Sequence, residues 1–117
     1  MNEIKNDLTF KRLREADVQR TEQVFEKLTA WSPTDWACAM AGECGEACNQ
    51  VKKLRRLDGG PVNTILEEEV KSRIGRELAD LIIYADLLAA RLGLDLDQEI
   101  IAKFNQVSRL TGSSVTL

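Results

Sequence analysis

Residues 35–56 read DWACAMAGECGEACNQVKKLRR, and residues 75–94 read GRELADLIIYADLLAARLGL. In both stretches apolar side chains recur at spacings of three and four, the period of an amphipathic α-helix. The expected apolar stripes are Met40, Cys44, Ala47, Val51 and Leu54 in the first stretch, and Ile74, Leu78, Leu81, Ala85 and Leu92 in the second. Two such stripes predict two amphipathic helices, which could pack together as an antiparallel hairpin.

Start and stop signals divide the chain into four helices. The predicted ranges are about 9–28, 32–57 and 64–92, with a fourth helix that begins at residue 95 or 97 and ends at 112. Ser32 is a predicted N-cap, with Pro33 in the first turn and Asp35 completing a capping box, and Thr64 forms a second capping box with Glu67. The stretch 58–61, DGGP, is expected to end the second helix, and residues 113–117 are expected to form a loose tail.

These patterns predict an all-α fold, a four-helix antiparallel bundle-like domain spanning residues 1–117. Ile83 and Leu87 form a second apolar strip on the third helix, about 160° from its main stripe. Either this helix is central in its own bundle, or another subunit covers the strip. In the second case, oligomerisation would complete the core.

Acidic side chains are the main functional signal. Glu43 and Glu46 lie three positions apart in one helix, and Glu77 and Asp80 lie three apart in the next. Residues at this spacing share a helical face, and both pairs are expected to flank the apolar stripes. Carboxylate oxygens are ligands for Mg²⁺ or Mn²⁺, ions that also bind phosphate oxygens. The competing interpretation is a pair of ordinary solvated helix faces.

The composition excludes several kinds of site. The 117 residues contain no histidine, which rules out Ser-His-Asp and Cys-His catalysis, HExxH zinc sites and Glu-x-x-His di-iron bundles. A net charge of −3 argues against a general nucleic-acid-binding surface. No apolar run approaches the roughly 18 residues that span a bilayer, and the charged stretch 1–14 is unlike a signal peptide. We expect a cytoplasmic protein without a membrane partner.

The cysteines and tryptophans have ordinary structural interpretations. Cys44 and Cys48 are expected to point into the apolar face as small buried hydrophobes, and no fourth ligand completes a soft-metal site with Cys38. Trp31 and Trp36 could stack on a nucleobase, although packing in the core or at an interface is the more usual role.

At the acidic pairs, the chain resembles the MazG-like, all-α nucleoside triphosphate pyrophosphohydrolases. The hallmark of that family is Glu-x-x-Glu on one helix and Glu-x-x-Asp on the next, and residues 103–112, KFNQVSRLTG, resemble its closing helix. The resemblance covers about residues 31–112 and rests on three ordered segments. Many members have a further glutamate directly before the first motif acid, where this chain has Gly42.

The resemblance implies Mg²⁺-dependent hydrolysis of a (deoxy)nucleoside triphosphate to the monophosphate and pyrophosphate, in a homodimer or homotetramer. The implied metal ligands are Glu43, Glu46, Glu77 and Asp80, with Glu46 also the candidate proton acceptor; the implied substrate contacts are Asn49, Lys53, Lys103 and Asn105. Two alternatives remain open: a non-catalytic helical interaction module, and a nucleotide-binding regulator that has lost turnover.

Overall fold

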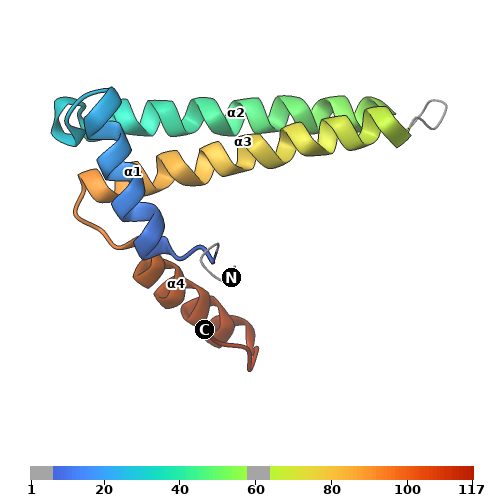
Figure 1. The fold of residues 1–117 in the computed structure, drawn as a ribbon. Helices are drawn as coiled ribbons and strands as arrows, with labels where there is room; N and C mark the ends of the chain where they lie inside the picture. The colour runs from blue at the N-terminus through green and yellow to red at the C-terminus, as the bar shows by residue number, and fades with distance from the viewer. Residues whose placement is uncertain (1–6, 58–63) are drawn as a thin grey trace, which may run out of the picture.

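The computed structural model describes residues 7–57 and 64–117, and all regular structure in these ranges is helical. The helices are α1 (Phe10–Val24), a short 3₁₀ turn η2 (Leu28–Ala30), α2 (Pro33–Leu57), α3 (Thr64–Arg91) and α4 (Leu96–Thr111). Helices α2 and α3 form a long antiparallel hairpin, and α1 crosses it near one end (Figure 1). The predicted all-α fold is confirmed.

Local hydrogen bonds explain where the helices begin. The Ser32 hydroxyl accepts the Asp35 backbone N–H at 3.2 Å, while the Asp35 carboxylate accepts the Ser32 N–H at 2.9 Å. This is the predicted capping box. At the start of α1, Thr9 accepts the Arg12 N–H at 3.1 Å. The predicted stop at 58–61 and the Thr64 side chain lie outside the described residues.

Helix α1 ends at Val24, four residues before its predicted end. The Glu22 carboxylate accepts the backbone N–H of Leu28 at 3.0 Å and so draws the chain into the separate turn η2. At the same end of the hairpin, Gly93 ends α3 with a φ of 72°, and the Leu94 N–H donates to the Ala89 carbonyl at 2.8 Å. This Schellman arrangement explains the predicted stop at glycine.

The seam between α2 and α3 differs from the predicted stripes. The shielded side chains alternate at spacings of three and four, as in a coiled coil: Met40, Glu43, Ala47, Gln50 and Leu54 on α2, and Val70, Ile74, Glu77, Leu81 and Tyr84 on α3. The predicted stripe residues Cys44, Val51, Leu78 and Leu92 are exposed instead. Glu43 and Glu77 therefore lie in the seam, where they were expected only to flank it.

The cysteine prediction is also wrong. Cys38, Cys44 and Cys48 are all exposed and free. Cys44 and Val51 each come directly after a seam residue of α2, and Leu78 comes directly after the seam residue Glu77 of α3. Because the two helices are antiparallel, residues that follow a seam position on either helix lie on the same side of the hairpin. Cys44, Cys48, Val51, Leu78 and Ile82 form what is called below the apolar face.

The opposite side of the hairpin is covered by α1. Leu87 is only 4% exposed and Ile83 is partly shielded, so the strip that they form is covered within the chain. The prediction that another subunit covers it is wrong, and the alternative, a central third helix, describes this side correctly.

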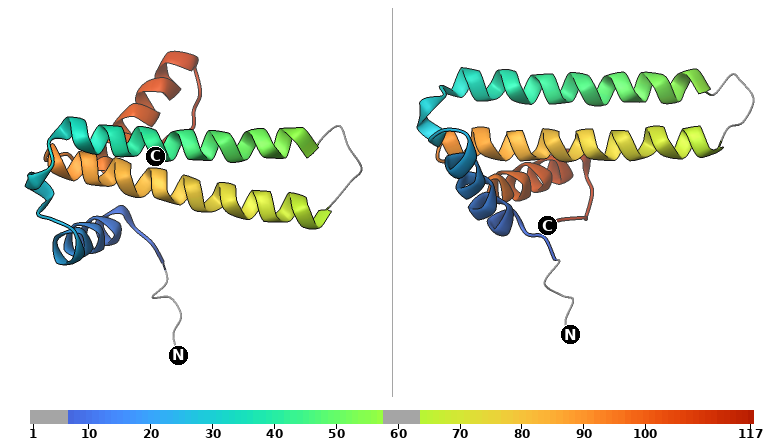
Figure 2. Two further views of the ribbon diagram at one scale, coloured as in Figure 1. Left: turned by 90° about the horizontal axis from the view of Figure 1, so that it is seen from above. Right: turned by 45° about the horizontal axis from the view of Figure 1, so that its top comes forward.

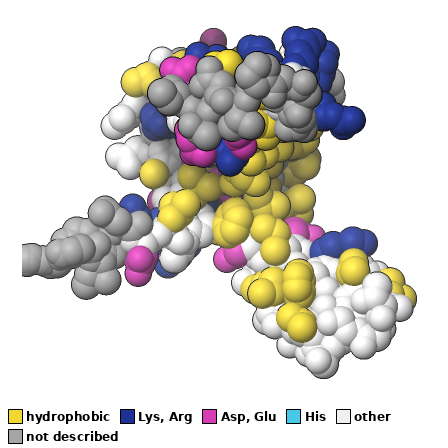
Figure 3. Space-filling model, turned by 90° about the vertical axis from the view of Figure 1, so that its right-hand side faces the viewer, with side chains coloured by type: hydrophobic (Ala, Val, Ile, Leu, Met, Phe, Trp, Pro, Cys, Tyr) yellow, Lys and Arg dark blue, Asp and Glu magenta, His cyan; other side chains and the backbone are white. Residues whose placement is uncertain are grey.

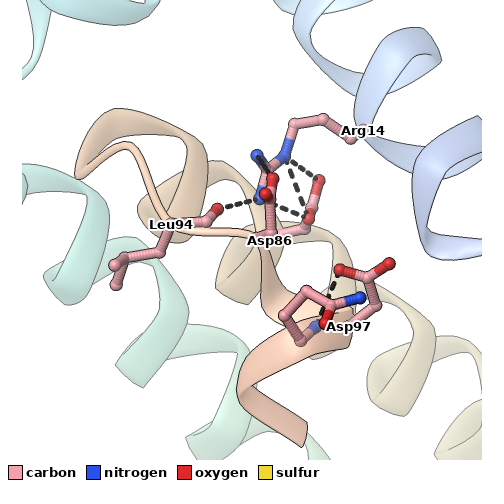
Figure 4. A network of polar contacts seen from close by, with 6 residues as sticks. Arg14, Asp86, Leu94 and Asp97 are labelled. Atoms are coloured by element: carbon pink, nitrogen blue, oxygen red, sulfur yellow. Dashed lines mark hydrogen bonds and ion pairs between the residues drawn. The ribbon is translucent and has the colours of Figure 1, made fainter. Parts of the chain in front are cut away.

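Arg14 clamps α1 onto α3. Its guanidinium donates to both carboxylate oxygens of Asp86, at 3.0–3.2 Å, and to the Leu94 carbonyl at 2.8 Å (Figure 4). The Asp86 side chain is 1% exposed, so the acidic half of this ion pair is buried where α1 packs on α3. One side chain thus fixes both the crossing of α1 and the turn that follows α3.

Helix α4 projects from the base of the hairpin and contacts α1 (Figures 1 and 2). It does not lie alongside α2 and α3 as a closed bundle requires. Hydrophobic side chains gather on one flank of the hairpin and continue onto α4 (Figure 3), where Phe104 and Val107 are more than two-fifths exposed. The tail 113–117 is irregular as predicted, yet Asn105 holds its last residue, Leu117, by two hydrogen bonds.

Candidate metal centre and adjoining cavity

Three carboxylates converge across the seam. Glu43 of α2 and Glu77 and Asp80 of α3 each offer one oxygen, and these oxygens lie within 4.8 Å of one another. Glu43 and Glu77 are partly shielded, whereas Asp80 is exposed. The helical spacing expected from the sequence therefore produces a common group of oxygen donors.

Glu46 joins this group from the next turn of α2. Its carboxylate lies close enough to those of Glu43 and Glu77 to raise the pKa of both. The structure thus brings all four predicted metal ligands to the same level of the hairpin. Together with Glu43, Glu77 and Asp80, Glu46 is called the carboxylate cluster below.

The electrostatics of the cluster oppose a state in which every acid is charged. Desolvation raises the pKa of Glu43, and repulsion from Glu46 and Asp80 raises it further. Desolvation and the contact with Glu46 likewise raise the pKa of Glu77. Each raised pKa means that the protein environment disfavours the carboxylate form.

A divalent cation fits these donors. Glu43 Oε2 and Glu77 Oε2 are buried and have no hydrogen-bond partner. Within residues 7–57 and 64–117, no lysine or arginine forms an ion pair with any member of the cluster. An all-oxygen set with unpaired, desolvated atoms is the chemistry that Mg²⁺ or Mn²⁺ prefers.

The predicted substrate contacts lie in two places. Asn49 and Lys53 are exposed on α2, one and two turns beyond Glu46. Lys103 and Asn105 are on α4, where Lys103 donates to Gln106 at 3.3 Å and Asn105 holds Leu117. Since α4 packs on α1, a single chain does not bring this second pair to the carboxylate cluster.

A cavity of about 750 Å³ adjoins the cluster. Helix α1, helix α3 and the segment 25–36 form its walls, and Asp80 belongs both to its lining and to the cluster. Asp17, deep in this wall, is only 2% exposed. Burial raises the pKa of Asp17 to about 6; repulsion from Asp86 adds to the rise, and Arg20 and Arg14 oppose it.

The sequence analysis did not identify Asp17 or Asp86. Asp86 carries a usable signal, because a carboxylate within the apolar run LIIYADLLAA requires a buried partner. Asp17 lies in a polar stretch of α1, and nothing in the sequence distinguishes it from its exposed neighbours Glu15 and Arg20.

No protein-family model matches the chain, and a search of the curated proteins found no match. The resemblance to the MazG-like family thus rests on the residues quoted above. Among the described residues, none of the helices is both long enough and apolar enough to cross a membrane.

Proposed function

We propose that the protein is a metal-dependent nucleoside triphosphate pyrophosphohydrolase, which releases pyrophosphate and a nucleoside monophosphate. One observation carries the proposal: Glu43, Glu77 and Asp80 converge within 4.8 Å, and two of their oxygens are buried without partners. A helical seam normally selects apolar side chains. A cation site requires acids that are held together despite their mutual repulsion. The position of Glu43 and Glu77 in the seam is not explained by solvation at the protein surface.

In this proposal Glu43, Glu77 and Asp80 hold Mg²⁺, and Glu46 completes the ligand set. When bound, the ion supplies charge neutralisation at phosphate oxygens and lowers the pKa of a coordinated water. Glu46 is exposed and next to the other acids, and in this proposal it accepts the proton of the attacking water. Asn49 and Lys53 extend the same side of α2 and would contact phosphate or sugar.

A second copy of the chain is the proposed partner, in a homodimer or homotetramer. The apolar face is open: Val51 and Leu78 are each 49% exposed and Ile82 is 46% exposed. Continuous apolar surface of this kind is unusual on a monomer and typical of an interface. Assembly would also give α4 of one protomer a route to the carboxylate cluster of another. We propose that the protein acts in the cytoplasm.

The direct test incubates the pure protein with each NTP and dNTP plus Mg²⁺, and measures pyrophosphate and orthophosphate separately. Pyrophosphate release that stops in excess EDTA supports the proposal. Glu46→Gln and Asp80→Asn should each lower kcat by at least about 100-fold, as loss of a catalytic or charge-stabilising group does. Glu68→Gln, on the exposed first turn of α3, is the matched control and should leave turnover unchanged.

The alternatives give different results. A nucleotide-binding regulator would bind a triphosphate with Mg²⁺ and release no pyrophosphate. A helical interaction module would bind neither nucleotide nor metal, and its stability would be equally insensitive to Asp80→Asn and Glu68→Gln. Full activity in excess EDTA would remove the metal site altogether.

A further inference from the structure

The cavity beside the carboxylate cluster has the dimensions and the position of a nucleoside pocket. Its volume of about 750 Å³ leaves room for a base and its sugar. Asp80 lies on its lining, so a ligand in the cavity would lie next to the metal ligands. A nucleotide whose phosphates reach the cluster can therefore place its base between α1 and α3.

Aromatic rings line one wall. The ring centroids of Trp31 and Trp36 are 4.6 Å apart, and those of Trp36 and Tyr84 are 6.4 Å apart. Trp36 is fixed, because it is 5% exposed and its indole N–H donates to the Leu28 carbonyl at 3.1 Å. Trp31 is 41% exposed, which leaves ring surface free to contact a ligand. Aromatic side chains of this kind stack on any type of base, so they add binding affinity without distinguishing one base from another.

Selectivity requires hydrogen-bonding groups, and Asp17 is the unusual one in this wall. Both of its carboxylate oxygens are buried and lack any hydrogen-bond partner. The nearest cation is Arg20, whose Nη2 is 4.0 Å from Asp17 Oδ1 and whose side chain is 64% exposed. A buried carboxylate without a hydrogen-bond donor is costly to a fold, and an ion pair to a largely exposed arginine offsets little of that cost, so a ligand that donates to it would gain binding energy.

We propose that this cavity binds the base of the nucleotide and that Asp17 and Arg20 select guanine. Ionised Asp17 offers two acceptors, and Arg20 offers donors beside them. Guanine presents the complementary edge, with N1–H and N2–H donors next to the O6 acceptor. Adenine and cytosine each present an acceptor where Asp17 needs a second donor, and uracil and thymine present a single N–H between two carbonyls. The inference rests on the proposed function in one respect only, namely that the ligand carrying the base is a nucleoside triphosphate.

The test uses nucleosides, so that neither metal nor turnover is needed. Guanosine, inosine, adenosine and cytidine are titrated in EDTA against the intact protein, and tryptophan fluorescence is followed. Guanosine should bind best. Inosine lacks the N2 amino group and should bind roughly 10- to 100-fold more weakly than guanosine. A loss of this size is expected when one of the two hydrogen bonds of a bidentate base contact is missing and one Asp17 oxygen stays buried without a donor.

Asp17→Asn should weaken guanosine binding by a similar factor and leave inosine, adenosine and cytidine little changed. Glu15→Gln is the matched control, because Glu15 is an exposed acid on the same helix and is not part of the cavity lining. Thermal melts of both variants check that the fold is retained. Equal affinity for all four nucleosides, no binding of guanosine, or unchanged guanosine binding by Asp17→Asn would each overturn the inference.

The pyrophosphate assay distinguishes this failure from failure of the proposed function. If guanosine binds selectively and no triphosphate is hydrolysed, the pocket stands and the enzyme assignment falls. If every triphosphate is hydrolysed with equal kcat/KM, and Asp17→Asn leaves these values unchanged, the enzyme assignment stands and base selection by Asp17 falls.

Discussion

Glu43 of α2 and Glu77 of α3 meet across a helical seam, and each keeps one buried carboxylate oxygen without a hydrogen-bond donor. The neighbouring seam residues Ala47 and Leu81 are apolar and shielded, as such positions require. Apolar packing at the neighbouring seam positions thus holds the two helices together, while repulsion between the carboxylates opposes their association. This opposition has measurable consequences for stability.

The first prediction concerns Glu77→Gln in EDTA. The substitution removes one of the repelling charges, and its amide can donate to the free Glu43 oxygen, so the variant should melt above the parent. Mg²⁺ at about 100 times its Kd should stabilise the parent by about 2.7 kcal/mol, or about 10 °C in Tm, and the variant by much less. Calorimetry with and without Mg²⁺ measures both effects. Glu68→Gln should behave as the parent, and melts insensitive to metal in all three proteins would contradict the prediction.

The second prediction is a pH-dependent gain in stability from Asp17→Asn. Because the pKa of Asp17 rises from 3.8 to about 6 on folding, its ionised form opposes the fold. The penalty is absent below about pH 4, grows between pH 4 and 6, and is complete above pH 6, where a rise of this size corresponds to about 3 kcal/mol. Urea unfolding at pH 4 and pH 8 should show the gain only at pH 8. Glu15→Gln is the control, and an equal gain at both pH values would refute the explanation.

The third prediction tests the clamp between α1 and α3. Arg14→Lys keeps the charge but cannot bind both Asp86 oxygens and the Leu94 carbonyl, because lysine lacks the planar fork of donors. Leaving the buried Asp86 poorly paired should cost about 2–4 kcal/mol in the free energy of unfolding. Arg12→Lys on the exposed side of α1 should change it by less than about 0.5 kcal/mol. Identical denaturation curves for the two variants would show that the ion pair does not hold α1.

The fourth prediction concerns assembly through the apolar face. Multi-angle light scattering at micromolar concentration should report at least a dimer, and Ile82→Glu should dissociate it by burying an unpaired charge. Ser72→Glu, which adds the same charge on the exposed outer side of α3, should leave the mass unchanged. A parent that remains monomeric would remove the proposed partner and leave the exposure of Val51, Leu78 and Ile82 unexplained.

The sequence predicted most helix boundaries because they depend on local chemistry. The Ser32–Asp35 capping box and the glycine stops at Gly93 and Gly112 act within a few residues of the chain, and each is present. The end of α1 was missed because it depends on the Glu22 carboxylate bonding forward to Leu28, a contact with no repeating pattern.

The position of the seam could not be predicted from hydrophobicity alone. On α2, two stripes compete: Cys44 and Val51 are apolar and exposed, while Glu43 and Gln50 are polar and lie in the seam. Any method that assigns the most apolar stripe to the core selects the wrong one. Side chains from both acidic pairs do converge, since their spacing depends only on helix geometry. Their role as a site and the metal that they are proposed to hold remain predictions.

The exposed thiols give the chain its own chemical reporters. Cys44 and Cys48 lie on the apolar face, whereas Cys38 is about 100° around the same helix and is also exposed. A maleimide should therefore alkylate Cys38 freely in any state and reach Cys44 and Cys48 slowly once a second copy covers them. Peptide mass spectrometry of briefly labelled wild-type protein would give the ratio of these rates. That ratio measures occupancy of the apolar face in the unmodified protein, with Cys38 as the internal standard.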